Sequence, residues 1–141
     1  MGEGIYSAAL MEHNAHPDYK YEMENATHTH EGVNPSCGDD IILSLRVVDG
    51  TVEEDAFTGS GCAVSLASAD IMADLITDET VDEAQRLAEL FLKMIRGEAT
   101  DEELEDLGEA AELKSISLMP ARVKCAELGW RTLLTIIEQD I

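Results

Sequence analysis

The sequence predicts an α+β fold in which a small three-stranded antiparallel sheet carries helices packed on one face. Two observations predict this class: segments with strand periodicity come early in the chain, and segments with helical periodicity come late. The length of 141 residues suits one domain, and an apolar fraction of 45% is enough for a core. We therefore expect residues 1–141 to form a single domain with no internal repeat and no long linker.

The early part of the chain is expected to hold one short helix and three strands. Residues 5–11 have apolar side chains at helical spacing, and residues 27–30 alternate as a short edge strand does. The clearest strand is residues 41–48, whose odd positions are all apolar. An Asp-Gly pair then predicts a hairpin turn, because glycine adopts positive φ at little cost, and residues 51–58 form the returning strand.

The later part of the chain is expected to be helical. Four helices are predicted, over residues 63–76, 81–96, 101–107 and 120–138. Thr80 and Thr100 each stand three residues before a glutamate, which is the pattern of a capping box at a helix start. Gly97 is expected to end the second of these helices, and a proline suits the first turn of the last one.

Charge excludes several classes of function. The chain has 30 acidic against 9 basic residues, a net charge of −21 at pH 7. Phosphate backbones and anionic lipids would repel such a chain, so we expect no nucleic-acid partner and no membrane partner. No apolar stretch approaches the ~20 residues of a membrane span, and the N-terminus lacks the pattern of a secretory signal. A cytoplasmic protein is expected.

Three cysteines stand at junctions between the predicted elements. An odd number does not suit a disulfide framework, so each is a metal ligand, a nucleophile or a buried core residue. Cys37 lies in a turn before the clearest strand, with Asp39 two residues on. Cys62 ends a Gly-x-Gly loop and opens a helix, whose free N–H groups favour a thiolate. Cys125 lies near the start of the last helix.

The three cysteines and Asp39 supply four ligands of the types that suit tetrahedral Zn²⁺. Arg122 and Lys124 flank Cys125, and we expect them to lower its pKa and to offset the negative charge of such a site. The residues alone leave the alternatives open: a Cys₃Asp metal site, a cluster of reactive thiols, or ordinary turn and core residues.

The four histidines are expected to be surface residues. His13 and His16 are three apart on the first predicted helix, and His28 and His30 are two apart on the first predicted strand. Either pair has a spacing that metal binding allows, but neither has a third ligand close by in the sequence.

Three motifs enclose the cysteines: Asn34-Pro-Ser-Cys37-Gly-Asp39, Phe57-x-Gly59-x-Gly61-Cys62-Ala-Val-Ser65-x-Ala67-Ser68 and Arg122-x-Lys124-Cys125-Ala126-x-Leu128-x-Trp130. Together they resemble the SufU branch of the IscU/NifU-type iron–sulfur cluster assembly family. Two features favour the SufU branch: Lys124 stands where IscU-like proteins carry a histidine, and residues 97–119 resemble the additional segment of SufU proteins.

The resemblance implies a SufU/IscU-like fold and a Zn²⁺ ion bound by Cys37, Asp39, Cys62 and Cys125. It also implies that Cys37 accepts persulfide sulfur from a SufS-type cysteine desulfurase, so that the protein acts as a sulfurtransferase-like partner that supplies downstream Fe–S scaffold proteins. The alternative is a scaffold that assembles a transient [2Fe–2S] cluster on the same four ligands, since thiolates suit both zinc and iron. A third interpretation is a structural zinc domain that only mediates protein contacts.

Overall fold

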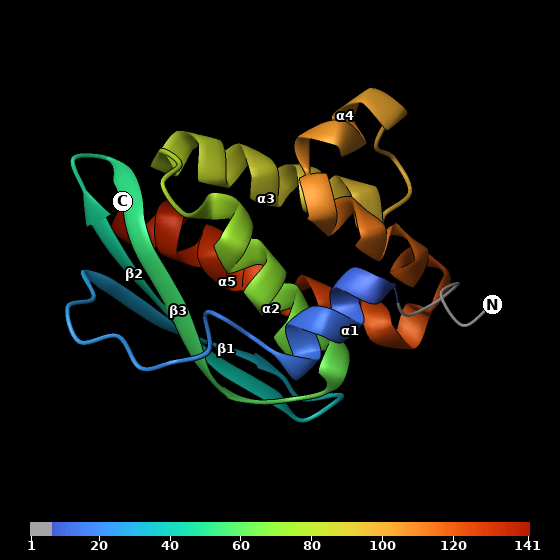
Figure 1. Ribbon diagram of the computed structural model, residues 1–141, viewed down its shortest axis with the longest axis horizontal. Coiled ribbons are helices and arrows are strands. Elements are labelled where there is room, and N and C mark those ends of the chain that lie inside the picture. The colour runs from blue at the N-terminus through green and yellow to red at the C-terminus, as the bar shows by residue number, and fades with distance from the viewer. Residues whose placement is uncertain (1–6) are drawn as a thin grey trace.

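The computed structural model describes residues 7–141, which form a three-stranded sheet and a layer of helices (Figure 1). In chain order the elements are α1 (Ala8–Ala15), β1 (His28–Asn34), β2 (Asp39–Val48), β3 (Thr51–Ser60), α2 (Ala63–Ile76), α3 (Val81–Ile95), α4 (Asp101–Asp106), the 3₁₀ helix η2 (Gly108–Leu118) and α5 (Pro120–Asp140). No helix among these residues is long and apolar enough to cross a membrane. The predicted α+β class is confirmed.

The sheet is antiparallel with the strand order β1-β2-β3, and the helices cover one of its faces (Figure 1). Leu43 of β2 lies between His30 of β1 and Phe57 of β3, which fixes the register. The odd residues of β2 point into the core, as their alternation predicts. At the β2–β3 turn, Asp49 and Gly50 have φ of 51° and 76°, the positive values that a tight hairpin turn requires.

Helices α2, α3 and α5 pack together around Trp130. Trp130 of α5 stacks on Phe91 of α3, with ring centroids 4.0 Å apart and planes inclined by 4°. The indole Nε1 donates to Ser68 Oγ of α2 at 2.9 Å, and that hydroxyl donates to the Ala126 carbonyl at 2.7 Å. The one buried polar atom of the tryptophan therefore has a partner, and three helices are fixed relative to one another.

Helix α5 lies directly on β1. A Cβ atom at Gly32 would collide with Thr132 of α5, so only glycine permits this approach. Helix α5 packs against β1 on one side and against α2 and α3 on the others. Its first turns therefore lie beside the end of β1. This packing carries Cys125 to the loop that holds Cys37.

Helix starts follow the capping prediction in part. At α4, Thr100 accepts from the Glu103 N–H, and the Glu103 side chain accepts from the Thr100 N–H, which completes the capping box. At α3, Thr80 accepts from the Glu83 N–H, but the Glu83 carboxylate pairs with Arg86 instead of returning to the cap. A bidentate guanidinium is a stronger partner than one backbone N–H.

The largest departure from the sequence prediction is η2, an 11-residue 3₁₀ helix between the helices predicted over residues 101–107 and 120–138. Its buried side chains recur every third residue, at Ala110, Leu113 and Ile116, and continue the spacing from Leu107 just before it. A period of three is that of a 3₁₀ helix, and it matches neither the period of 2 of a strand nor the period of 3.6 of an α-helix. The first helix also differs: it begins at Ala8 with Ser7 as its cap, and the expected start at residue 5 lies outside the described residues.

Candidate metal centre

Three segments that are distant in the sequence meet at one end of the sheet. They are the loop between β1 and β2, the start of α2 and the first turns of α5. The sulfur atoms of Cys37 and Cys125 lie 3.1 Å apart. One ligand atom from each of Cys37, Asp39 and Cys125 lies within 4.8 Å of the other two, and this is the one such group of three among residues 7–141. Three of the four expected ligands are thus brought together.

Cys62 stands beside this group as the N-cap of α2. Its sulfur accepts from the Ser65 N–H at 3.5 Å, so the expected contact between the thiol and the helix N-terminus is present. Its backbone N–H donates to Asp39 Oδ1 at 2.8 Å, so Cys62 adjoins the group of three. The Cys62 sulfur does not lie within 4.8 Å of all three other ligand atoms.

Asp39 is fully buried, and both of its carboxylate oxygens accept hydrogen bonds. The Cys62 N–H and the Ser65 hydroxyl donate to Oδ1 at 2.8 and 3.1 Å, and Asn34 Nδ2 donates to Oδ2 at 3.1 Å. Burial acts to raise the pKa of Asp39, but the hydrogen bonds together hold it below its ordinary value. Gly61 makes this possible, since a Cβ there would lie 2.7 Å from Asp39 Oδ1.

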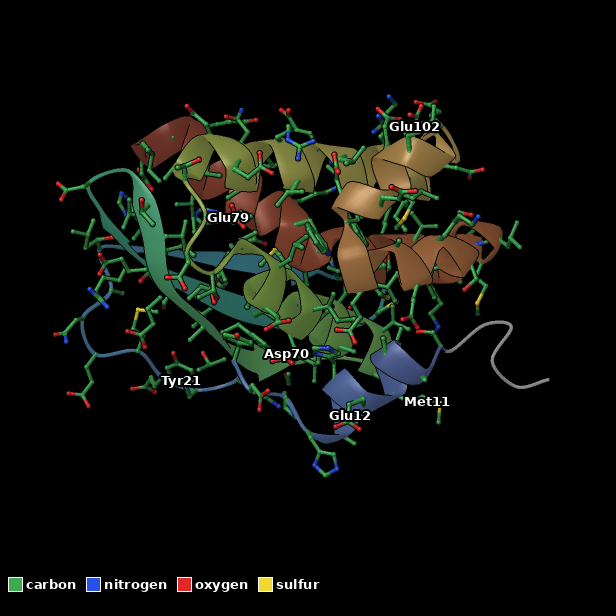
Figure 2. The ribbon with its side chains drawn as sticks, turned by 45° about the horizontal axis from the view of Figure 1, so that its top comes forward. Met11, Glu12, Tyr21, Asp70, Glu79 and Glu102 are labelled. Atoms are coloured by element: carbon green, nitrogen blue, oxygen red, sulfur yellow. The ribbon has the colours of Figure 1, made fainter. Side chains whose placement is uncertain are left out.

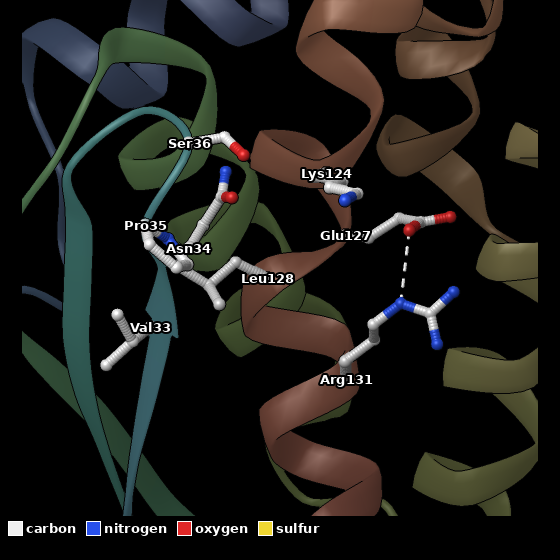
Figure 3. Close-up of a pocket in the computed structure, with 8 residues that line it drawn as sticks. All are labelled: Val33, Asn34, Pro35, Ser36, Lys124, Glu127, Leu128 and Arg131. Carbon is white, nitrogen blue, oxygen red and sulfur yellow. Dashed lines mark hydrogen bonds and ion pairs between the residues drawn. The ribbon is translucent and has the colours of Figure 1, made fainter.

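The expectation that the pKa of Cys125 is lowered is wrong. Cys125 is fully buried, and burial raises the pKa of its thiol, with further increases from Cys37, Cys62 and Asp39. Lys124 is exposed and lines a neighbouring pocket of about 380 Å³ between β1 and α5 (Figure 3). Successive residues of a helix point about 100° apart, so a cation next in sequence need not face the same site.

The histidines are not part of the centre, and one of them is not a free surface residue. His13 of α1 contacts Asp70 of α2 and Glu109 of η2, each at 2.6 Å; Asp70 is labelled in Figure 2. Burial acts to lower the pKa of His13, but these two carboxylates raise it above its ordinary value. His13 therefore ties the first helix to two others, which corrects the expectation that it is an ordinary surface side chain.

A sequence profile described as the NifU-like N-terminal domain matches residues 5–138 of the chain. The chain belongs to this family. Similar curated proteins cover nearly the same span: the iron–sulfur cluster assembly scaffold protein IscU of Thermotoga maritima is 41% identical over 135 residues, 92% of this chain and 89% of that protein. The zinc-dependent sulfurtransferase SufU of Bacillus subtilis is 35% identical over 130 residues, 92% of this chain and 86% of that protein.

The three-dimensional structure agrees with membership of the NifU-like family. A crystal structure described as an iron–sulfur cluster assembly scaffold protein for the SUF system, from Fervidobacterium islandicum, superposes with a TM-score of 0.89. The two sequences are 31% identical, and the alignment covers 97% of this chain and 99% of that one. The SufU/IscU-like fold expected from the three cysteine motifs is therefore confirmed.

Two polar residues of this NifU-like domain were missed as parts of the site. Asn34 and Ser65 are both buried, and both donate to Asp39. Each stands inside a cysteine motif, three residues before Cys37 and three residues after Cys62. A buried amide or hydroxyl beside a candidate ligand is a usual second layer of a metal site, so the motifs did contain the signal.

Proposed function

We propose that this protein is an iron–sulfur cluster assembly protein of the SufU type, which accepts sulfur from the persulfide of a SufS-type cysteine desulfurase. The observation that carries the proposal is the convergence of Cys37, Asp39 and Cys125 beside Cys62, in a chain whose relatives include a zinc-dependent sulfurtransferase. Membership of the NifU-like family supports the cluster assembly role.

The side chains at the centre fit a zinc ion. Three thiols and one carboxylate are ligands that Zn²⁺ takes in tetrahedral sites, and Asp39 is held ready by its hydrogen bonds. Cys37, Asp39, Cys62 and Cys125 would hold the ion. When bound, zinc would keep the sulfurs deprotonated and protect them from oxidation. The crowding of these groups, with Lys124 turned to another pocket, favours a dication as the compensating charge.

Cys37 is the proposed sulfur acceptor because it is half-buried in a turn where Gly38 has a φ of 71°. Cys125 is fully buried, and Cys62, which is half-buried as well, accepts from the Ser65 N–H at the start of α2. The Cys37 thiolate attacks the terminal sulfur of the desulfurase persulfide and forms a new S–S bond. The old S–S bond breaks, and its electron pair leaves with the desulfurase cysteine as a thiolate. The proton of the persulfide stays with the transferred sulfur, so the exchange needs no oxidant or reductant.

The test combines metal analysis with a single-turnover assay on protein purified without air. A persulfidated SufS-type desulfurase is mixed with the wild type or with Cys37→Ser, and labelled sulfur on each chain is counted. We expect about one zinc per chain in the wild type and no sulfur uptake by Cys37→Ser. If Cys37→Ser still takes up sulfur, the acceptor is wrong. If the wild type holds zinc but never takes up sulfur, the protein is a structural zinc domain.

The second candidate function is assembly of a [2Fe–2S] cluster on the same residues, with the cluster as cargo. The observation that favours it is the 41% identity to a relative named a scaffold protein. The residue types do not separate the two functions, because thiolates bind iron and zinc alike. Anaerobic reconstitution with iron and sulfide decides: a brown protein that passes its cluster to an apo-ferredoxin is a scaffold, and a colourless one is not.

A further inference from the structure

We propose that Asn34 is the positioning residue of the metal centre: its carboxamide holds the carboxylate of Asp39 and the sulfur of Cys125 in the arrangement that a metal ion requires. Asn34 touches neither the ion nor the transferred sulfur, and it acts through the two ligands. The inference rests on the proposed metal centre, and its test separates the two claims.

The geometry of one nitrogen atom carries the proposal. Asn34 is the last residue of β1, is 5% exposed, and is paired in register with Asp39, the first residue of β2. Its Nδ2 lies 3.1 Å from Asp39 Oδ2 and 3.6 Å from Cys125 Sγ. An amide nitrogen has two hydrogens, one for each acceptor. A single side chain therefore connects a ligand of β2 to a ligand of α5, which lie 86 residues apart in the chain.

The two oxygens of Asp39 are held from different sides. Oδ1 accepts from the start of α2, through the Cys62 N–H and the Ser65 hydroxyl. Oδ2 accepts from Asn34 at 3.1 Å. Without the amide, Oδ2 would lose its hydrogen bond from β1, and the two donors of α2 would hold the carboxylate from one side only. With it, Oδ2 is kept next to the Cys125 sulfur, because one nitrogen contacts both atoms.

The backbone of Asn34 makes a hydrogen bond of its own, so the role of the side chain can be tested separately by substitution. The Asn34 carbonyl accepts from the Cys37 N–H at 3.3 Å and so closes the turn before the acceptor cysteine. This bond does not depend on the side chain. Asn34→Leu keeps the size of the side chain and removes both hydrogen bonds, while Asn34→Ser keeps a polar group that is too short to bridge the two ligands.

The experiment measures metal binding and not sulfur transfer. Zn²⁺ affinity is obtained by competition with a chromophoric chelator, and Co²⁺ is used as a spectroscopic substitute that reports its ligands. We expect Asn34→Leu and Asn34→Ser to bind Zn²⁺ about 10- to 100-fold more weakly, the usual effect of losing such a supporting contact. The sulfur-to-cobalt charge-transfer band should move to longer wavelength, because Cys125 loses a hydrogen bond that stabilises its lone pairs.

Two controls separate positioning from loss of stability. Asn25→Leu changes an exposed asparagine in the same way and should bind both metals as the wild type does. Ser68→Ala removes buried hydrogen bonds to Trp130 and Ala126, and its thermal unfolding calibrates what general destabilisation does to affinity. Should Ser68→Ala weaken Zn²⁺ binding as much as the Asn34 variants do, at an equal loss of stability, the effect is general and the proposal is wrong.

The remaining outcomes are decisive as well. A wild type that binds Zn²⁺ and Co²⁺ through its thiols, together with Asn34 variants of unchanged affinity and unchanged cobalt spectrum, overturns the role of Asn34 alone. A wild type that binds neither metal through its thiols overturns the metal centre and the role of Asn34 with it. If Asn34→Leu does not fold, Asn34→Ser gives the measurement.

Discussion

Asp39 differs from the other proposed ligands because it offers oxygen among sulfurs and is already committed to three hydrogen bonds. Zinc is borderline-soft and is held less firmly by a carboxylate than by a thiolate. A mixed ligand set suits a metal that must rearrange when a partner arrives, whereas Cys₄ sites are those of structural zinc.

Replacing Asp39 with cysteine should therefore separate binding from transfer. We expect Asp39→Cys to bind zinc at least as tightly as the wild type and to accept sulfur about tenfold more slowly or worse. Single-turnover transfer from a persulfidated desulfurase, with zinc measured in parallel, checks both. Asp40→Cys is the matched control, because Asp40 is exposed and points away from the centre. A wild-type rate in Asp39→Cys would show that ligand lability is not what permits transfer.

Asp55 of β3 is another buried carboxyl, and its pKa is raised, whereas that of Asp39 is lowered. Burial raises its pKa to about 8, the charges of Asp74, Glu54 and Asp70 add to the rise, and the Thr77 hydroxyl opposes it. The folded state thus keeps the proton up to about pH 8, whereas the unfolded chain releases it near the ordinary value of 3.8. The free energy of unfolding must therefore fall as pH rises between these two values.

Asp55→Asn should remove this pH dependence, because the amide is neutral and its oxygen can still accept from Thr77. We expect the variant to exceed the wild type in unfolding free energy by on the order of 3 kcal/mol at pH 8.5 and by little at pH 4. Urea unfolding at the two pH values checks this. Asp18→Asn, an exposed aspartate, should change neither value; parallel curves for the wild type and Asp55→Asn would mean that Asp55 is ionised in the fold.

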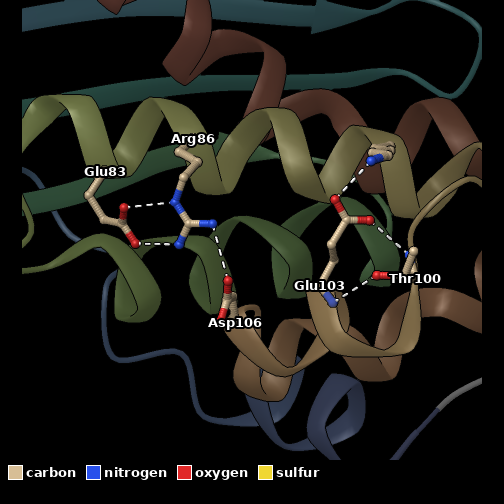
Figure 4. A network of polar contacts seen from close by, with 6 residues as sticks. Glu83, Arg86, Thr100, Glu103 and Asp106 are labelled. Atoms are coloured by element: carbon tan, nitrogen blue, oxygen red, sulfur yellow. Dashed lines mark hydrogen bonds and ion pairs between the residues drawn. The ribbon is translucent and has the colours of Figure 1, made fainter.

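Among the helices, α4 is held to the rest of the molecule mainly by polar contacts. It has no buried residue, and it is held to α3 by the Lys93–Glu103 and Arg86–Asp106 pairs at 2.8 and 3.2 Å (Figure 4). Exposed ion pairs of this kind contribute about 0.2–1 kcal/mol each, and salt screens them. The neighbouring Leu107 is fully buried, so the segment is anchored at its end.

Added salt should therefore increase local unfolding of α4 and leave α3 folded. Amide hydrogens of residues 101–106 are expected to exchange several-fold faster in about 1 M KCl than in about 0.05 M KCl. Glu103→Gln should give fast exchange even at low salt. Glu105→Gln is the control, since the described residues give Glu105 no ion pair. Exchange that is independent of salt in the wild type would mean that apolar contacts hold the helix.

Elements with a strong apolar period or a capping box were predictable from the sequence, and those with neither were predicted poorly or not at all. Helix α2 begins and ends at the predicted residues, Ala63 and Ile76, because its apolar spacing and its glycine loop agree. Strand β1 was predicted too short, because an edge strand with polar side chains on both faces has a weak pattern. Of the candidate site, the grouping of Cys37, Asp39 and Cys125 was predictable from the motifs. The surroundings of Cys125 were not, since they depend on how α5 packs.

At the scale of the whole molecule, a net charge of −21 means that most surface groups repel one another. Salt weakens this repulsion within a Debye length of about 10 Å at 0.1 M and about 3 Å at 1 M. We expect the melting temperature to rise by several degrees between about 0.05 and 1 M KCl, the reverse of the response of α4. Calorimetry in KCl checks it, with sucrose as an uncharged control. A falling melting temperature would mean that ion pairs outweigh the repulsion.

The contact between Cys37 and Cys125 joins residues 88 positions apart, with the start of α2 alongside. A metal ion bound there would act on chain connectivity as a crosslink does, closing long loops whose freedom the unfolded chain would otherwise keep. Occupancy of the centre would then set the lifetime of the protein as well as its chemistry. Molecules without the ion would then unfold more readily, and proteases would cleave them sooner.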